Sequence, residues 1–460
     1  ISIRSRVRTA NLDLRVSDRD RYVFSAVFKR LTKKPSTFFL VFGSALLLSV
    51  SPVLADVDPD EIPQVGLPDG LVMEVFLADL QFPVSMAWTP EGELYFTEKA
   101  TGRVRYYDGE ILRDAAFASL PVDAQIERGL LGIAIDPEYA ENRFVYVFYT
   151  RADPLSNRVV RVRNEEGVGV EPVVLLDAPI TTGYFVHNGG NMAFGPDGML
   201  YVTLGENNFP PWSIRLDVPY GKVLRIDPSD GSAPRDNPFY DDGDPGTGND
   251  DRIFAYGLRN PFDLTFRPGS GELFVSENGP ACDDEINLIR SAADYGWRVD
   301  YPCPEGLNVG WPAVESFTPA FAPTGIAFYE GEALSDYEGD LFMCSWMRGS
   351  LMHIELGGAR SDGRPVVENI ESWGQGCGTD VAVGPDGFLY ISHAGWGESE
   401  GTIRRVRPGT LEPDWPIGNG HFFTQMAADS NREGYAVTDD DDARFHSEFE
   451  RLGGVESFGF

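Results

Sequence analysis

The chain has 460 residues, of which 42% are hydrophobic and 12% aromatic, so it has enough apolar side chains for a large folded core. Acidic residues dominate, because 71 Asp and Glu stand against 38 Lys and Arg and give a formal net charge of −33. This charge argues against nucleic acid and anionic membrane surfaces as partners.

The first 55 residues predict a basic extension followed by a secretory signal peptide. Basic residues at 29–34 precede the apolar run 38–50, and Val-Leu-Ala at 53–55 is an acceptable cleavage site. We expect a secreted mature chain that starts near Asp56 and has no membrane span; the alternative is an uncleaved anchor. Because 10 of the 38 basic but only 3 of the 71 acidic residues lie in this stretch, the mature chain would have a net charge near −40.

An internal repeat indicates the architecture. Each copy is a Pro, Gly or Asp turn followed by an apolar and aromatic strand. The copies are TPEGELYFTE from 89, DPEYAENRFVYVFYT from 136, GPDGMLYVTLGE from 195, RPGSGELFVSE from 267, EGDLFMCSW from 338 and GPDGFLYISH from 384. We therefore predict an all-β fold, a six-bladed β-propeller with inserted loops in a domain of residues 56–408.

The ring needs strands that close it, and residues 75–88 and 402–406 are the candidates. A β-helix or two β-sandwiches are the alternatives, but neither explains why turn and strand recur as one unit. The acidic insertion 227–251 either covers a sheet edge, which we favour, or binds calcium.

Residues 184–191, YFVHNGGN, place His187 on a turn directly before a strand. Histidine titrates near neutral pH, so a histidine at the mouth of a propeller is a candidate general base. Considered alone, a histidine that only holds the turn by hydrogen bonds is the commoner case.

Residues 255–297 combine a strand, a turn and fixed charges. Asn278-Gly279-Pro280 exposes backbone carbonyls at the end of a strand, and Asp283, Asp284 and Glu285 follow at once. Carbonyl and carboxylate oxygens are the ligands that calcium prefers, so the segment predicts a calcium site. The alternative is that the aspartates cap the turn and are solvated.

The four cysteines, Cys282, Cys303, Cys344 and Cys377, are an even number in a chain expected to be exported, so two disulfides can form. Their order favours Cys282 with Cys303 and Cys344 with Cys377, although sequence does not fix the connectivity. Their spacing does not suggest a zinc site.

Several motifs in series resemble the soluble pyrroloquinoline-quinone-dependent sugar dehydrogenases, a family of glucose, sorbosone and other aldose dehydrogenases. The resemblance covers most of residues 67–408. The motifs are ERGLLGIAIDPEY from 127, HNGGNMAFGPDGMLYVTLGE from 187, GKVLRIDP from 221, RNPFDLTF from 259, GPACDDEINLI from 279 and YGW from 295.

The resemblance implies a quinone (PQQ) and a calcium ion at the propeller mouth. His187 would take the proton from the sugar hydroxyl while hydride passes to the quinone, and Arg259 and Asn260 would contact the quinone. The carbonyls of Gly279 and Pro280 would bind the calcium beside it.

The resemblance further places Glu285 and Tyr295 at positions associated with another calcium ion in some members. For these two residues, plain loop structure is the alternative.

The chain departs from the family pattern at other cofactor-binding positions. Glu127 stands where the family often has Gln, and Met347 where a lysine is expected, although Arg348 is adjacent. Cys377 and Thr379 fall at two expected arginines. Burying an acidic quinone without cationic partners is costly.

Two function classes follow from this sequence. One is a secreted enzyme that oxidises an aldose or related sugar aldehyde and passes electrons to an acceptor. The other is a cofactor-free extracellular propeller that acts as a binding module. A calcium-dependent sugar lactonase is a third and weaker option, because the motif series argues against it.

The tail 409–460 ends in a short amphipathic stretch followed by Gly-Gly and resembles the start of an appended repeat module. The alternative is an ordinary polar terminus.

Overall fold

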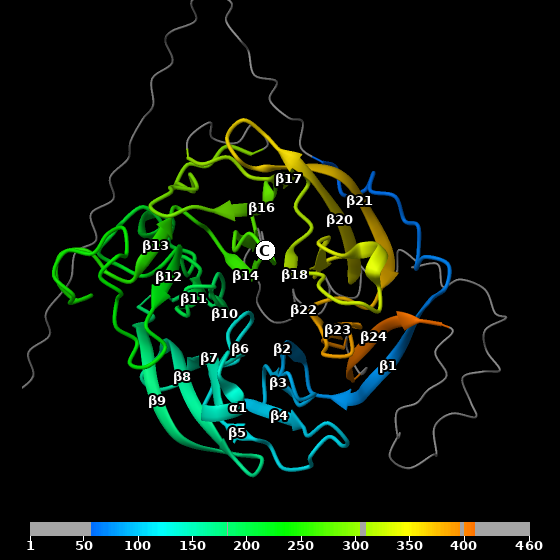
Figure 1. Ribbon diagram of the computed structural model, residues 1–460. Helices are drawn as coiled ribbons and strands as arrows, with labels where there is room; N and C mark the ends of the chain where they lie inside the picture. The colour runs from blue at the N-terminus through cyan, green and yellow to red at the C-terminus, as the bar shows by residue number, and fades with distance from the viewer. Residues whose placement is uncertain (1–56, 182, 304–309, 396–399, 410–460) are drawn as a thin grey trace, which may run out of the picture. The chain divides into compact units, whose positions relative to one another are not determined.

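A computed structural model describes residues 57–409 except 182, 304–309 and 396–399. The predictions for residues 1–55 and for almost all of 409–460 therefore lie outside the described residues. The described chain is a ring of six four-stranded antiparallel sheets, so the predicted six-bladed propeller is confirmed (Figure 1).

Each blade is a meander whose first strand is the innermost one. Blades one and two contain β2 (Pro83–Trp88), β3 (Leu94–Glu98), β4 (Arg103–Tyr107), β5 (Ala118–Ser119), β6 (Leu130–Ile135), β7 (Phe144–Arg151), β8 (Ser156–Glu165) and β9 (Val168–Pro179). Blades three and four contain β10 (Gly189–Phe194), β11 (Leu200–Leu204), β12 (Lys222–Ile226), β13 (Ile253–Tyr256), β14 (Pro261–Phe266), β15 (Leu273–Glu277), β16 (Asp284–Ile289) and β17 (Glu315–Phe317). Blades five and six contain β18 (Pro323–Phe328), β19 (Leu341–Ser345), β20 (Ser350–Ala359), β21 (Pro365–Gln375), β22 (Asp380–Val383), β23 (Leu389–His393), β24 (Gly401–Pro408) and β1 (Leu71–Leu80).

Helical structure within the described ranges is limited to short turns: α1 (Tyr139–Asn142), η1 (Pro210–Trp212) and η2 (Ser335–Tyr337). None of the described helices is long and apolar enough to cross a membrane.

The repeated turn has a physical basis in the structure. In the β10–β11 turn, Gly198 has a φ of 76°, and the side chain of Asp197 accepts hydrogen bonds from the backbone N–H of Met199 (3.1 Å) and the hydroxyl of Tyr201 (3.0 Å). Asp386 makes the same two bonds in the β22–β23 turn, at 3.1 and 2.7 Å. The second strand of such a hairpin is buried on both faces between neighbouring blades, which is why these strands read as continuous apolar runs.

The ring closes in the last blade, where β1 pairs with β24 in the register Leu71 to Pro408 (Figure 1, blue beside orange). The candidate closing segment 402–406 is therefore right, but 75–88 is right only in its first half. Strand β1 ends at Leu80, and Phe82 has a left-handed φ of 56° that turns the chain. Pro83–Trp88 then forms the innermost strand of the first blade.

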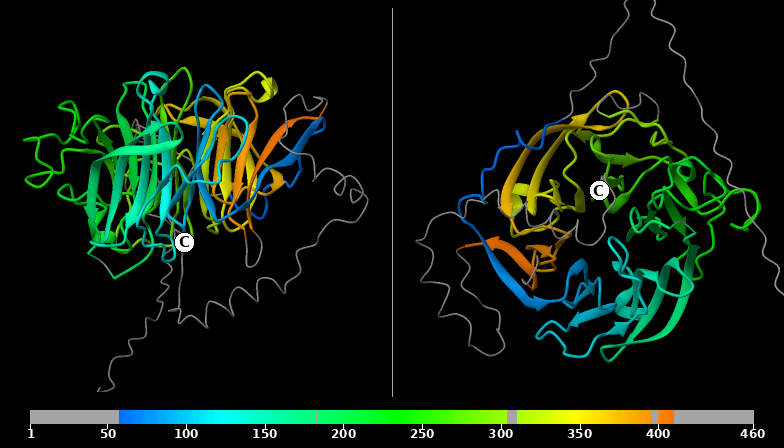
Figure 2. Two further views of the ribbon diagram at one scale, coloured as in Figure 1. Left: turned by 90° about the horizontal axis from the view of Figure 1, so that it is seen from below. Right: turned by 180° about the vertical axis from the view of Figure 1, so that it is seen from behind.

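The innermost strands contact one another in ring order around the axis of the ring that Figure 2 shows from two sides. Four antiparallel strands bring the chain back to the end at which a blade begins, so every innermost strand begins at the same end of the ring. Because neighbouring strands in a blade are antiparallel, the second strand of every blade ends where the first begins. Side chains just before a first strand and just after a second strand therefore gather at this end, which we call the mouth.

Candidate functional site

The structure brings most of the predicted site residues to the mouth. Glu127, His187, Arg259, Asn260 and Thr379 lie just before innermost strands, and Gly279, Pro280, Met347 and Arg348 lie just after second strands. Glu285 and Tyr295 lie in and after β16 of the fourth blade, and Cys377 precedes β22.

His187 is held by a carboxylate that the sequence analysis missed. Its side chain is 2% exposed, and its Nδ1 lies 2.6 Å from Oε1 of the fully buried Glu206. Burial raises the pKa of Glu206 to about 8, while the positive charge of Arg259 opposes the rise. His187 itself has a φ of 58°, a left-handed conformation that is uncommon for this residue type and is fixed here by its neighbours.

Glu127 ties this pair to the next blade. Its Oε2 accepts hydrogen bonds from the backbone N–H of His187 at 2.6 Å and from Nδ2 of Asn260 at 3.4 Å. Its Oε1 is buried and accepts no hydrogen bond from the described residues. Burial raises the pKa of Glu127, whereas the His187 N–H and the charges of Arg259 and Lys99 lower it.

Arg259 and Asn260 are both buried at the start of β14. The Arg259 guanidinium donates to the carbonyl of Asn278 at 2.9 Å and lies over the ring of Trp297, 5.5 Å from its centroid. Asn260 accepts a hydrogen bond from the N–H of Gly189 at 3.0 Å. Burial lowers the pKa of Arg259, and the carboxylates of Glu206 and Glu127 oppose this. The four side chains His187, Glu206, Glu127 and Arg259 thus form one electrostatic unit.

The Gly279–Pro280 turn presents two carbonyl oxygens that the described residues do not bind. The carboxylate of Asp284 accepts the N–H groups of Gly279, Phe321 and Ala322 at 2.8, 2.6 and 2.7 Å. Burial raises its pKa to about 6. Asp284 thus caps the turn, as the alternative expected, but the aspartates are not solvated, because Asp283 and Asp284 are both buried. The carbonyls of Gly279 and Pro280 accept no hydrogen bond from the described chain.

A second group of oxygens lies on the strands beside this turn. Glu285 is the cross-strand partner of Glu277, and Nδ2 of Asn287 donates to both carboxylates, at 2.9 and 2.8 Å. Burial raises the pKa of Glu277 to about 7, and burial together with the charge of Glu277 raises the pKa of Glu285 well above its usual range. Two carboxylates this close, one buried and one partly buried, favour a cation between them or a shared proton.

The hydroxyl of Tyr295 has a structural role. The hydroxyl donates to the carbonyl of Leu288 and accepts the N–H of Arg290, both at 2.8 Å. The backbone carbonyl of Tyr295 is therefore the atom left for a metal.

Met347 and Arg348 do not add charge to the centre of the mouth. Met347 is 60% exposed. The guanidinium of Arg348 donates to Oδ1 of Asp60 at 2.6 Å and is thereby held by the segment that precedes the propeller.

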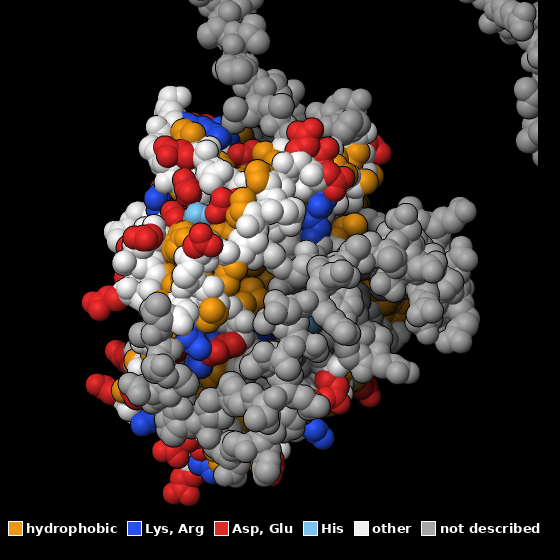
Figure 3. Space-filling model, turned by 90° about the vertical axis from the view of Figure 1, so that its right-hand side faces the viewer, with side chains coloured by type: hydrophobic (Ala, Val, Ile, Leu, Met, Phe, Trp, Pro, Cys, Tyr) orange, Lys and Arg blue, Asp and Glu red, His pale blue; other side chains and the backbone are white. Residues whose placement is uncertain are grey.

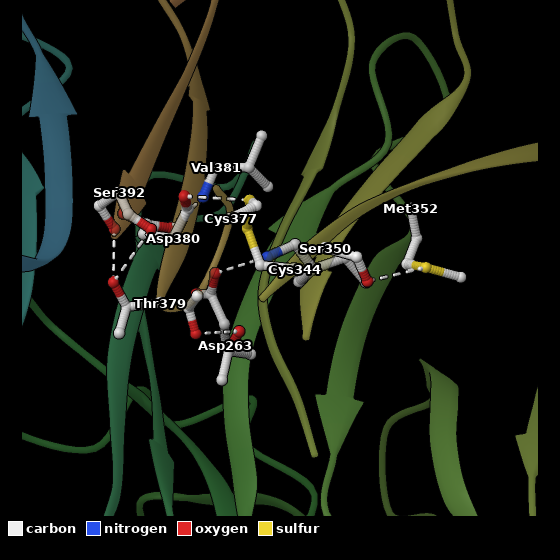
Figure 4. Close-up of a disulfide and its surroundings, with 12 residues drawn as sticks. Asp263, Cys344, Ser350, Met352, Cys377, Thr379, Asp380, Val381 and Ser392 are labelled. Atoms are coloured by element: carbon white, nitrogen blue, oxygen red, sulfur yellow. Dashed lines mark hydrogen bonds between the residues drawn. A yellow bond between two sulfur atoms is a disulfide. The ribbon is translucent and has the colours of Figure 1, made fainter. Parts of the chain in front are cut away.

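Cys377 and Thr379 are engaged with the fifth and sixth blades (Figure 4). Cys377 forms a disulfide with Cys344 of β19, and Cys282 forms one with Cys303, so the preferred pairing is confirmed. The hydroxyl of Thr379 donates to the carbonyl of Pro83 at 2.9 Å and lies 2.6 Å from the hydroxyl of Ser392. Neither side chain carries a charge, and both are already engaged, so neither can form an ion pair with a carboxylate of a cofactor.

The acidic insertion joins β12 to β13. Oxygens of Asp241, Asp242 and Asp251 come within 4.8 Å of one another. Each carboxylate already accepts hydrogen bonds from the loop, however, as in the contact of Asp251 with the N–H of Gly243 at 2.7 Å.

Comparison with known proteins defines the family. Residues 80–405 match the family model described as "Glucose / Sorbosone dehydrogenase", and the chain belongs to this family. The class of protein is therefore that of the soluble, propeller-fold sugar dehydrogenases.

Particular relatives give detail. The chain is 27% identical to the aldose sugar dehydrogenase YliI of Escherichia coli over 366 residues, which are 73% of this chain and 92% of that protein. It is 32% identical to quinoprotein glucose dehydrogenase B of Acinetobacter calcoaceticus over 255 residues, 49% of this chain and 52% of that one. The PQQ-bound structure of the aldose sugar dehydrogenase of Streptomyces coelicolor superposes with a TM-score of 0.60 at 26% identity, covering 74% of this chain and 99% of that chain.

The mouth fits a calcium ion and an acidic quinone on chemical grounds. The carbonyls of Gly279 and Pro280 are hard oxygen ligands that receive no hydrogen bond from the described residues. The guanidinium of Arg259 is buried at the start of β14 in the same blade, where it can face a cofactor oxygen.

Proposed function

We propose that the protein is a secreted, calcium- and PQQ-dependent dehydrogenase that oxidises an aldose or a related sugar aldehyde. The observation that carries this proposal is the His187–Glu206 pair, buried one blade away from Arg259 and Asn260. A buried histidine held by a carboxylate, next to a buried arginine, is an arrangement for moving a proton where negative charge develops.

His187 is the general base in this proposal. Because Nδ1 is engaged by Glu206, Nε2 is the ring atom that takes the proton from the sugar hydroxyl. Glu206 fixes the orientation of the ring and stabilises the imidazolium that forms. Glu127 holds the backbone of His187, so the ring keeps its position relative to the fourth blade.

The bound quinone would supply an electrophilic carbonyl that accepts hydride, and calcium would polarise it. Gly279 and Pro280 would hold the calcium, and Arg259 and Asn260 would orient the quinone. The donors of Arg259 and Asn260 are preorganised by Asn278 and Gly189, so little reorganisation would be needed during reaction.

A further calcium ion between Glu285 and Glu277 is part of the proposal. Its support is the cross-strand pair of the buried Glu277 and the partly buried Glu285, with one amide nitrogen shared between them. A divalent cation would neutralise both charges and rigidify the strand that follows the Gly279–Pro280 turn.

Secretion and a neutral substrate agree with the charge and the disulfides. Carboxylates, in red, spread over the described part of one side of the ring in Figure 3. An acidic surface repels anions and does not affect a neutral sugar. The two disulfides fit an oxidising compartment, which the signal-like residues 1–55 also predict.

Reconstitution tests the proposal. The full chain, loaded with calcium and PQQ, should reduce an artificial electron acceptor with one or more of a panel of aldoses. His187→Ala should keep PQQ binding and lose turnover by about 10²-fold or more. His353→Gln is the matched control, because His353 is buried in the fifth blade between Asp340 and Glu371, outside the mouth, and should retain turnover. Full activity in His187→Ala would remove this residue from the mechanism.

The second candidate is a cofactor-free propeller that binds an extracellular ligand. It is favoured by the uncharged Met347, Cys377 and Thr379 and by the pairing of Arg348 with Asp60. The wild-type chain would then fail to bind PQQ at micromolar concentration in the presence of calcium.

A further inference from the structure

Arg404 of β24 has a half-buried guanidinium that forms no ion pair with the described residues. Its neighbours Arg405 and Arg407 both donate to Oε1 of Glu74, at 2.6 and 2.9 Å. No carboxylate of the described chain pairs with Arg404, and its Nε is buried with no hydrogen-bond partner there. Partial burial lowers its pKa. A cation that has lost part of its hydration and has no anionic partner among the described residues is costly, so this arrangement needs a reason.

The position of Arg404 gives the reason. Adjacent residues of a strand point to opposite faces, so Arg404 points away from the face on which Arg405 meets Glu74. A Cβ placed on Gly376 would lie 2.5 Å from Nη1 of Arg404, so the guanidinium lies in the space that this glycine leaves open. Gly376 begins the connection from β21 to β22, which enters the mouth.

This connection has no cation of its own. Residues 376–379 are Gly-Cys-Gly-Thr, and Thr379 lines a small axial cavity together with Glu127 and Gly189. The neighbouring His393, on the same sheet face as Arg404, adds no positive charge near neutral pH, because burial and the charge of Arg404 lower its pKa. Arg404 is therefore the positive group that the sixth blade offers to an anion at the mouth.

We propose that Arg404 binds a carboxylate of the acidic quinone cofactor and supplies charge that residues 347, 377 and 379 do not. This assignment rests on the proposed function. A planar guanidinium recognises a carboxylate through two parallel hydrogen bonds, and it does so most strongly where water is partly excluded.

The test compares PQQ binding to the calcium-loaded full chain with and without this charge. Arg404→Gln should weaken PQQ binding by about 10- to 100-fold, measured by fluorescence titration or calorimetry. Arg405→Gln is the matched control, because it removes a charge from the next residue on the opposite face, and it should change PQQ affinity by less than about threefold. The trimethyl ester of PQQ, which has lost the carboxylate charges, should bind wild type and Arg404→Gln equally.

Thermal unfolding without cofactor gives a second readout. Arg404→Gln should leave the melting temperature unchanged or raise it, because the variant loses an unpaired charge, whereas Arg405→Gln should lower it. Unchanged PQQ affinity in Arg404→Gln, or equal weakening of PQQ and its ester, would overturn the assignment and leave the proposed function intact. Failure of the wild type to bind PQQ would overturn both.

Discussion

The carboxylate pair Glu277–Glu285 allows a quantitative test of the second calcium site. Both side chains accept a hydrogen bond from Nδ2 of Asn287, at 2.8 and 2.9 Å. Two oxygens bonded to one nitrogen are about 4–5 Å apart, and two full charges at that distance repel by about 3–4 kcal/mol at an effective dielectric constant of 20. Glu285→Gln removes this repulsion and keeps the shape of the side chain.

The sign of the effect depends on pH. The folded-state pKa of Glu277 is raised to about 7, and that of Glu285 is also raised. The folded protein therefore holds protons that the unfolded chain has released. This contribution to stability is fully present below the unfolded-state pKa and is lost as the pH rises through about 7. Without calcium, Glu285→Gln should then match wild type near pH 4 and exceed its stability by about 2–4 kcal/mol at pH 8, or roughly 3–6 °C in Tm.

The assay is thermal unfolding at both pH values, with EGTA or with millimolar calcium. Calcium should raise the Tm of the wild type at pH 8 and should raise that of Glu285→Gln much less. Glu98→Gln is the control, since Glu98 is a fully buried glutamate paired with Arg105 at 3.2 Å and should lose stability with and without calcium. The reasoning is refuted if Glu285→Gln is less stable than wild type in EGTA at pH 8, or if calcium stabilises both equally.

Other variants test the rest of the molecule. Glu206→Gln should lower kcat about 10- to 100-fold and remove the rise of kcat towards pH 8 that ionisation of Glu206 predicts, while PQQ affinity, measured by titration, stays within a few-fold. Replacing Cys344 and Cys377 together by Ser should destabilise the chain by about 3–4 kcal/mol in denaturant titration, because their disulfide closes a loop with a sequence separation of 33. Lys222→Met should cost about 2–4 kcal/mol in the same assay, because the buried Nζ donates to three backbone carbonyls at 2.6–2.9 Å in and near the loop that follows Glu206.

The fold was predictable because its unit is local. The turn aspartate and the tyrosine it binds are four residues apart, as in Asp197 and Tyr201, so each copy is visible in a short window of sequence. The misplaced half of 75–88 shows the limit of this reasoning. Both halves read as apolar strands, and only the left-handed Phe82 and the ring closure assign them to different blades.

The site was predictable in part, and the missed residues share one property. His187, Arg259 and Asn260 have side chains that suggest chemistry by themselves, whereas Glu206, the last residue of the motif that begins at His187, reads as a polar loop residue 19 positions away. Its contact depends on the path of the β10–β11 hairpin. The sequence does contain one signal: Glu206 comes two residues after the buried second strand β11, and His187 comes two residues before the first strand β10. Both side chains are therefore expected at the mouth. Glu277 was hidden in the same way, because only the β15–β16 register places it opposite Glu285.

The charges at the mouth make calcium and quinone binding interdependent. Glu206 and Glu277 are buried there and Glu127 is partly buried, and burial raises the pKa of each. Arg259 and Lys99 are the buried cations beside these three carboxylates, so an acidic quinone that entered this field without calcium would meet net repulsion as the carboxyl groups ionise. Calcium at the Gly279–Pro280 turn removes part of the repulsion, and the quinone in turn adds negative charge that strengthens calcium binding. Since such coupling is reciprocal, each ligand should tighten the other by the same factor. Arg404 differs from calcium in this respect, because it is a fixed charge that favours the quinone whether or not the metal is bound.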